Sequence, residues 1–405
     1  MSFKVVANPN FGTRRKASEA QLANYSSDVV DKVRAFHSSI DGYAVTPLVS
    51  LNGLARELGV DSIFVKDESY RFGLNAFKAL GGSFAVGSYL AGRLGVDISE
   101  LPYDRMISDE VRAALGEVTF ISATDGNHGR GVAWTANKLR QKCVIHMPKG
   151  SASERLENIR ALGATADITE FNYDDSVRLS AREAYENGWV LMQDTSWDGY
   201  EEVPISIIQG YLTMLAEADE QLDGVVPTHV FAQAGVGALA AAIVSFFVNK
   251  YGTSEDGGPK IIIVEPNNAA CIFETLSSED GKIHAVGGSL NTIMAGLACG
   301  EPITVGIDIL ANSTDFVASV PDYVAAVGMR VLAKPVGKDF PIVSGESGAA
   351  TLGFTYEVLT NPDLADVKAQ LGLDTSSKLF FISTEGATDQ ANYDAIVNNN
   401  AYPHP

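Results

Sequence analysis

A lysine in an apolar segment is the first residue whose surroundings suggest chemistry. Lys78 lies within LNAFKALGG, residues 74–82. Burial disfavours the ammonium form and lowers a lysine pKa from about 10.4, which makes the amine nucleophilic. Such an amine can form an imine with an aldehyde cofactor and can later act as a base. The alternative is an ordinary helix lysine whose stem packs on the protein while its ammonium stays in water.

A glycine-containing loop follows the apolar run 118–124. It reads ATDGNHGRG, residues 123–131, and leads into a helical pattern over 129–140. A strand, a glycine turn and a helix N-terminus together present backbone N–H groups and a positive dipole end to an anion. We expect a carboxylate of substrate or cofactor to bind here, and the short Asn127 side chain to reach a cofactor ring oxygen. A capping turn without a ligand is the alternative.

Two further segments have the same character. AQAGVGAL, residues 232–239, is again a strand, a glycine turn and a helix start, which suits a phosphate, although it lacks the full G-x-G-x-x-G and the Walker lysine. Ser383 and Thr384 end the apolar strand 378–384, where open α/β sheets bind their ligands. A hydroxyl there can hydrogen-bond a pyridine nitrogen without protonating it. A Ser/Thr helix cap is the alternative.

The elements that carry these motifs predict an α/β fold with two Rossmann-like domains and mostly parallel sheets. Apolar strands and helical patterns alternate from about residue 118, as in repeated βαβ units. We predict a large domain formed by residues 1–88 and 217–405. A smaller domain, residues 89–216, carries the Gly-Asn-His-Gly loop. The predicted strands are 118–124, 143–148, 166–171 and 189–194 in the smaller domain, and 229–235, 260–266 and 378–384, with a strand near residue 64, in the larger.

The composition excludes several classes of partner. The net charge of −20, with 30 basic residues among 50 acidic ones, argues against nucleic acid. No basic amphipathic stretch suggests a membrane. The three cysteines have no metal-ligand spacing, so we expect no metal site and reduced thiols. The N-terminal segment lacks the apolar run of a signal peptide, which predicts a cytoplasmic protein.

Taken in order, these motifs resemble a known family. Asn75-x-x-Lys78, the Gly-Asn-His-Gly loop, the glycine turn and the C-terminal Thr384 resemble the fold-type II pyridoxal 5'-phosphate (PLP) enzymes, the class of tryptophan synthase β and threonine dehydratase. Within that class the chain is similar to the diaminopropionate ammonia-lyase family over nearly its whole length. The segments that carry this similarity are residues 71–85, 123–134, 192–204, 233–240, 292–302 and 345–350.

The resemblance implies a PLP cofactor bound to Lys78 as a Schiff base. It places Phe77 at the cofactor, Asn127 at the ring oxygen and Thr384 at the pyridine nitrogen. The phosphate would rest on Gly235, Val236, Gly237 and Ala238. A homodimer is also expected, with a small amino acid as the substrate.

The resemblance also gives Asp125 a purpose, because this family carries aspartate just before the loop. A PLP imine makes the substrate α-proton acidic, and a base on either face can then remove it. Lys78 would act on L-2,3-diaminopropionate and Asp125 on the D-isomer, and the products would be pyruvate and two ammonia. Asp125, Gly126 and Asp194 are the candidate substrate-binding residues. For Asp194, a surface or capping carboxylate is the alternative.

Two other functions remain open. A serine or threonine dehydratase runs the same elimination with hydroxide as leaving group, but gains little from the extra negative charge of Asp125. A PLP-binding or regulatory protein without turnover should have lost the lysine or the loop, and both are intact here.

Overall fold

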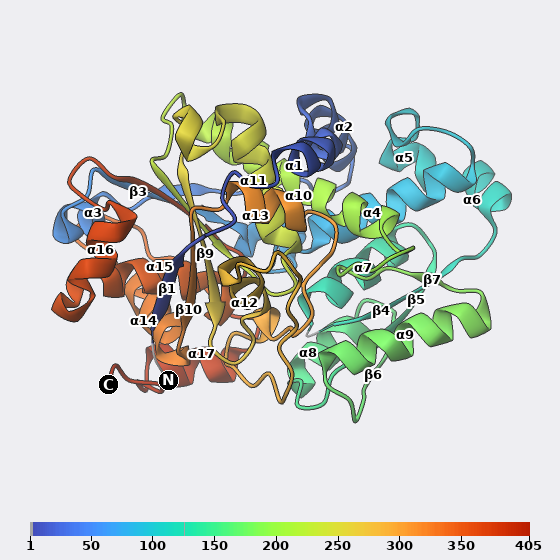
Figure 1. The fold of residues 1–405 in the computed structure, drawn as a ribbon. Coiled ribbons are helices and arrows are strands. Elements are labelled where there is room, and N and C mark those ends of the chain that lie inside the picture. The colour runs from blue at the N-terminus through green and yellow to red at the C-terminus, as the bar shows by residue number, and fades with distance from the viewer. Residues whose placement is uncertain (1–2, 125) are drawn as a thin grey trace.

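The structure is a computed structural model that describes residues 3–124 and 126–405, and it contains two β-sheets (Figure 1). The larger sheet has seven strands in the order β1-β10-β9-β8-β11-β3-β2. Its strands are β1 (Lys4–Ala7), β2 (Leu48–Ser50), β3 (Ser62–Asp67), β8 (His229–Gln233), β9 (Lys260–Pro266), β10 (Phe316–Val320) and β11 (Lys378–Ser383). All neighbours pair in parallel except the two edge strands, β1 against β10 and β2 against β3.

The smaller sheet has four parallel strands in the order β6-β5-β4-β7. They are β4 (Thr119–Ala123), β5 (Lys142–Met147), β6 (Thr165–Ile168) and β7 (Val190–Leu191). In Figure 1 this sheet lies to one side of the larger one, with α7, α8 and α9 around it. We call the four-stranded sheet with the helices packed on it the small-sheet unit, and the seven-stranded sheet with its helices the large-sheet unit.

Helices cover both faces of the larger sheet, which explains why its central strands are apolar throughout. Phe380 and Phe381 are consecutive in β11, point to opposite faces, and are both buried in separate hydrophobic clusters. The helices are α1 (Arg15–Leu22), α2 (Ser27–Ser38), α3 (Asn52–Leu58), α4 (Ala79–Arg93), α5 (Tyr103–Met106), α6 (Asp109–Leu115), α7 (Asn127–Lys138), α8 (Ser153–Arg160), α9 (Tyr173–Asn187), α10 (Glu202–Gln221), α11 (Ala238–Tyr251), α12 (Cys271–Ser277), α13 (Ile307–Ser313), α14 (Asp322–Ala333), α15 (Glu346–Thr360), α16 (Ala365–Leu371) and α17 (Gln390–Val397).

The predicted fold class is confirmed: both sheets are mostly parallel and belong to an α/β architecture. Strands from both ends of the chain form the larger sheet, and strands from its middle form the smaller one. The predicted domain limits at 88/89 and 216/217 fall inside α4 and α10, two long helices that pack on each other, and these limits remain a proposal. Within residues 3–124 and 126–405, no helix is long and apolar enough to cross a membrane.

Candidate active site

One cavity brings together nine of the residues singled out in the sequence. Its lining includes Phe77, Lys78, Asn127, Asp194, Gly235, Val236, Gly237, Ala238 and Thr384. Gly126 does not line this cavity; it precedes α7 with a φ of 144°, and its N–H donates to Thr124 Oγ1 at 2.9 Å. Asp125 lies outside the described residues, so its predicted role rests on the sequence.

Lys78 stands directly before α4, on a segment fixed to the end of β11. The Phe77 N–H donates to the Thr384 carbonyl at 3.0 Å, and the Gly386 N–H donates to the Asn75 carbonyl at 3.0 Å. Asn75 has a φ of 59°, a left-handed conformation that asparagine tolerates better than most residues. These backbone contacts set Lys78 beside Thr384, although the two are far apart in the sequence.

A buried ionic cluster holds the chain leading to Lys78. Arg71 donates to Glu68 at 2.8 Å and to Glu217 of α10 at 2.7 Å, and Lys66 of β3 donates to Glu217 at 2.9 Å. All four side chains are fully buried. Burial raises the pKa of Glu217, but Arg71 and Lys66 outweigh it and hold that pKa well below its ordinary value. Removing one partner would leave an uncompensated buried charge, so the cluster stabilises one arrangement of this segment.

A close helix contact places the Gly-Asn-His-Gly loop near Lys78. A Cβ atom on Gly131 of α7 would lie 2.9 Å from the Ala79 Cα and 3.0 Å from the Lys78 carbonyl oxygen. Only glycine allows this approach, which presses the start of α7 against the start of α4. Asn127, the first residue of α7, thereby lines the same cavity as Lys78.

The Lys78 amine is paired with a buried carboxylate. Its Nζ donates to Asp194 Oδ2 at 2.7 Å, and the Lys78 and Asp194 side chains are 16% and 4% exposed. The Tyr173 hydroxyl donates to Asp194 Oδ1 at 2.9 Å. Burial raises the pKa of Asp194, but the charge of Lys78, the neighbouring His128 and these hydrogen bonds outweigh it, so the pKa lies well below its ordinary value. Asp194 is therefore ionised and poised to bind a cationic amine.

His128 has a structural contact on one ring nitrogen. Its Nε2 lies 2.7 Å from the Met192 carbonyl oxygen, which accepts hydrogen bonds and cannot donate them, so Nε2 carries the hydrogen. Nδ1 faces Asp194 Oδ2 at 3.9 Å. This geometry gives His128 a structural role as a hydrogen-bond donor to the Met192 carbonyl.

The turn between β8 and α11 fits a phosphate group. Gly237 has a φ of 108° and precedes α11, whose start is capped by no side chain among the described residues. The 14-residue helix therefore offers its first N–H groups and positive dipole end to the cavity. A Cβ on Gly235 would come within 3.1 Å of the Gly296 carbonyl oxygen and 3.2 Å of Cys299 Sγ, so only glycine leaves this part of the cavity open.

Thr384 offers a hydroxyl to the same cavity. Gln233 Nε2 lies 3.3 Å from Thr384 Oγ1 and also donates to the Ile382 carbonyl at 3.0 Å. A hydroxyl that accepts from an amide can direct its own hydrogen elsewhere, as a neutral pyridine nitrogen requires. Lysine, glycine turn and hydroxyl together are the donor set that PLP needs, so these residues fit the cofactor.

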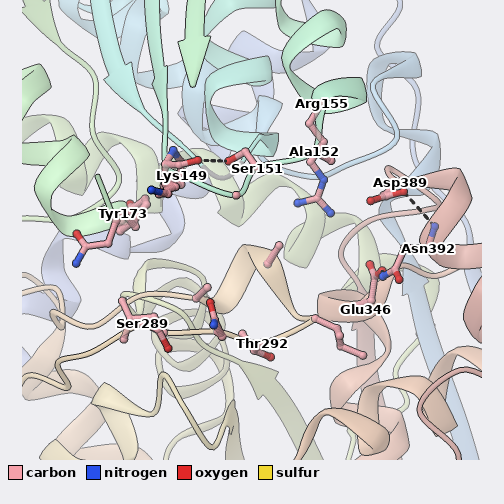
Figure 2. Close-up of a pocket in the computed structure, with 18 residues that line it drawn as sticks. Lys149, Ser151, Ala152, Arg155, Tyr173, Ser289, Thr292, Glu346, Asp389 and Asn392 are labelled. Atoms are coloured by element: carbon pink, nitrogen blue, oxygen red, sulfur yellow. Dashed lines mark hydrogen bonds between the residues drawn. The ribbon is translucent and has the colours of Figure 1, made fainter. Parts of the chain in front are cut away.

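A second, outer cleft lies between the two units (Figure 2). Its lining on the small-sheet side is residues 148–152, Arg155 and residues 172–173. On the other side it is residues 289–293, Ala295, Ala298, Glu346, Asp389 and Asn392. Tyr173 lines the outer cleft and also contacts Asp194 of the inner cavity. The two spaces are thus neighbours, joined through the contact between Tyr173 and Asp194.

Glu346 lines this cleft, and its environment predicts how the free energy of unfolding depends on pH. Burial, with the nearby Glu385, raises its pKa to about 7. A carboxyl whose pKa is raised in the folded state stabilises the fold at low pH and loses that contribution as the pH rises from about 4.5 to 7. Relative to wild type, Glu346→Gln should therefore gain about 3 kcal/mol of unfolding free energy between pH 5 and pH 8. Urea unfolding at both pH values measures this, and a constant difference between the two proteins would contradict it.

Comparison with known proteins identifies the family. The family model of pyridoxal-phosphate dependent enzymes matches residues 40–361. A diaminopropionate ammonia-lyase of Salmonella typhimurium is 48% identical over 395 residues, which cover 96% of this chain and 97% of that protein. The chain belongs to the diaminopropionate ammonia-lyase family.

Solved structures agree with this assignment. A crystal structure of the Escherichia coli diaminopropionate ammonia-lyase in complex with D-serine has a TM-score of 0.90 and 42% identity, covering 99% of this chain and 98% of that one. Another, with an aminoacrylate-PLP azomethine reaction intermediate, has a TM-score of 0.89 and 43% identity over the same shares. This member of the diaminopropionate ammonia-lyase family is thus a PLP-dependent lyase.

Several residues of the cavity were not assigned from the sequence. Tyr211, Leu239, Gly296, Leu297, Cys299, Ser347 and Glu385 also line it. Glu385 follows Thr384 directly, but nothing in the sequence indicated its contact with Asn127 of α7. Cys299 and Tyr211 come from a loop and a long helix without any motif for chemistry, and sequence patterns gave no reason to select them.

Proposed function

We propose that this enzyme eliminates ammonia from 2,3-diaminopropionate and yields pyruvate and a second ammonia. The observation that carries the proposal is the pair of Lys78 and ionised Asp194, 2.7 Å apart in a cavity whose glycine turn and Thr384 hydroxyl fit PLP. The lysine can bind the cofactor covalently, while the buried carboxylate can bind the second ammonium group of the substrate.

We assign the cofactor contacts as follows. Lys78 holds the cofactor covalently, with Phe77 beside it, and Asn127 donates to its ring oxygen. The N–H groups of the turn Gly235, Val236, Gly237 and Ala238 bind the phosphate, and the Thr384 hydroxyl donates to the pyridine nitrogen. When bound, PLP withdraws electrons from the substrate and makes its α-proton acidic.

Two bases remove that proton from opposite faces in this proposal. The Lys78 amine accepts it from the L-isomer, and the Asp125 carboxylate accepts it from the D-isomer. The support for Lys78 is its position in the cavity. The support for Asp125 is its place in the sequence, directly before the Gly-Asn-His-Gly loop.

Asp194 and Gly126 complete the substrate site in the proposal. The ionised Asp194 already stabilises one ammonium, that of Lys78, and would keep the substrate β-amine protonated. A protonated amine leaves as neutral ammonia with the electron pair of the broken C–N bond. Gly126, at the start of α7, binds the substrate carboxylate through the helix N-terminus. Water then hydrolyses the released aminoacrylate to pyruvate and the second ammonia.

Substrate competition tests the proposal against a dehydratase. We expect kcat/KM for 2,3-diaminopropionate to exceed that for L-serine and L-threonine by at least about 100-fold, because only the diamine forms the buried ion pair. Pyruvate and 2-oxobutyrate formation by the PLP-loaded wild type measures this. A preference for serine or threonine would leave the PLP lyase class in place but refute the ammonia-lyase assignment.

We also propose that the enzyme works as a homodimer, as the resemblance to PLP enzymes of this class implies, and that it is cytoplasmic. Sedimentation equilibrium should give twice the mass of the chain. A monomeric particle with full activity would refute the dimer.

A further inference from the structure

Glu385 is a buried carboxylate that joins the two units at the cavity. It is 2% exposed, and three donors meet it. Asn127 Nδ2 donates to Oε2, the Ser347 N–H donates to Oε1 at 3.2 Å, and the Thr388 hydroxyl donates to Oε2 at 3.3 Å. Asn127 belongs to the small-sheet unit, whereas Ser347 and Thr388 belong to the large-sheet unit. The carboxylate is therefore a direct link between α7 and the start of α15.

This contact fixes the orientation of the Asn127 amide. An ionised carboxylate only accepts hydrogen bonds, so Asn127 must present Nδ2 and not Oδ1 to it. The amide nitrogen has two hydrogens, and one is used at Glu385. The other remains available for a second acceptor in the cavity that Asn127 and Glu385 both line. If the amide turned over, its oxygen would face the carboxylate and the second donor would be lost.

We propose that Glu385 is a positioning residue, which holds the Asn127 amide so that it donates to the cofactor ring oxygen. This inference rests on the proposed function, in which Asn127 makes that contact. Glu385 also sits where a negative charge is favoured, since the N-terminus of α15 points at it. The arrangement ties the small-sheet unit to the large-sheet unit at the cofactor.

Glutamine cannot replace Glu385 in this role. Both carboxylate oxygens accept from N–H groups, one from Asn127 and one from Ser347. The Ser347 N–H is backbone and keeps its place, so a glutamine would present its oxygen to Ser347 and its NH₂ group to Asn127. The Asn127 amide must then turn over, and its oxygen faces the cofactor.

The experiment compares Glu385→Gln with Thr388→Val in the PLP-loaded enzyme. Thr388→Val is the matched control because it removes a different donor to the same carboxylate. The readouts are the dissociation constant for PLP and the pH midpoint of the bound-cofactor absorbance. We expect Glu385→Gln to weaken PLP binding about tenfold and to move the midpoint by at least about 0.5 pH unit. Thr388→Val should leave the PLP affinity within about twofold.

Asn127→Ala separates this inference from the proposed function. It should reproduce the changes of Glu385→Gln, and the double variant should be no worse than Asn127→Ala alone. If Asn127→Ala changes neither readout, the proposed role of Asn127 fails. If Asn127→Ala changes both but Glu385→Gln behaves like Thr388→Val, or if the two effects add, only the inference about Glu385 fails.

If Glu385→Gln does not fold, Glu385→Asp provides a second test. Glu385→Asp keeps an acceptor-only group but lengthens its contact with Asn127. It should disturb the absorbance midpoint in the wild-type background and have no further effect in the Asn127→Ala background. An equal effect in both backgrounds would overturn the inference.

Discussion

Replacing Lys78 with alanine should remove the visible absorbance of lysine-bound PLP and lower kcat for both isomers of 2,3-diaminopropionate by at least about 10³-fold. The reason is that, in the proposed mechanism, Lys78 is both the covalent anchor of the cofactor and the base for the L-isomer, and a general base alone contributes about 10²–10⁴-fold. Absorbance spectra after PLP loading and steady-state pyruvate release measure the two effects.

Lys142→Ala is the matched control for this variant. Lys142 lies at the start of β5, with 64% of its side chain exposed, and pairs with Glu117 on the surface. An exposed pair contributes little to stability, so absorbance and activity should be unchanged. If Lys78→Ala kept the absorbance of a lysine-bound cofactor, another lysine would be the anchor and the site assignment would be wrong.

Asp125→Asn should lower kcat for D-2,3-diaminopropionate by about 10²–10⁴-fold and leave the L-isomer within about tenfold of wild type. An asparagine amide cannot accept the α-proton, whereas in the proposed mechanism Lys78 still accepts it on the other face. A modest loss with both isomers would reflect a weaker attraction for the substrate ammonium. Separate assays of the two pure isomers measure the difference.

The control for Asp125→Asn is Asp109→Asn, which changes a carboxylate on the surface of α6 that is 94% exposed. It should affect neither isomer. Equal losses of both isomers in Asp125→Asn would assign Asp125 to binding alone, and the two-base part of the proposal would fail.

Much of the fold follows from the sequence because buried parallel strands are continuous apolar runs. The strands predicted over 143–148 and 260–266 correspond to β5 and β9, each within one residue at either end. The edge strands β1 and β2 were not predicted, since neither contains a fully buried residue and neither forms a continuous apolar run. β10 was also missed, and its pairing with β9 joins segments about 50 residues apart by contacts that no local pattern specifies.

The candidate site was predictable where function depends on local motifs. Lys78, the glycine turn and Thr384 each lie at the end of a strand or the start of a helix. The fold brings these ends together at one cavity. Contacts between distant side chains were not predictable. Lys78 and Asp194 are 116 positions apart, and Asn127 and Glu385 are 258 apart. These pairs form only in the folded chain, where α7 packs on α4 and the Phe77 N–H bonds to the Thr384 carbonyl.

The most direct test of the central claim is the ratio of ammonia to pyruvate released from D- and L-2,3-diaminopropionate by the PLP-loaded wild type. Elimination followed by hydrolysis predicts two ammonia for each pyruvate from either isomer, and no turnover without PLP. One ammonia for each pyruvate, or no pyruvate at all while L-serine is consumed, would contradict the claim.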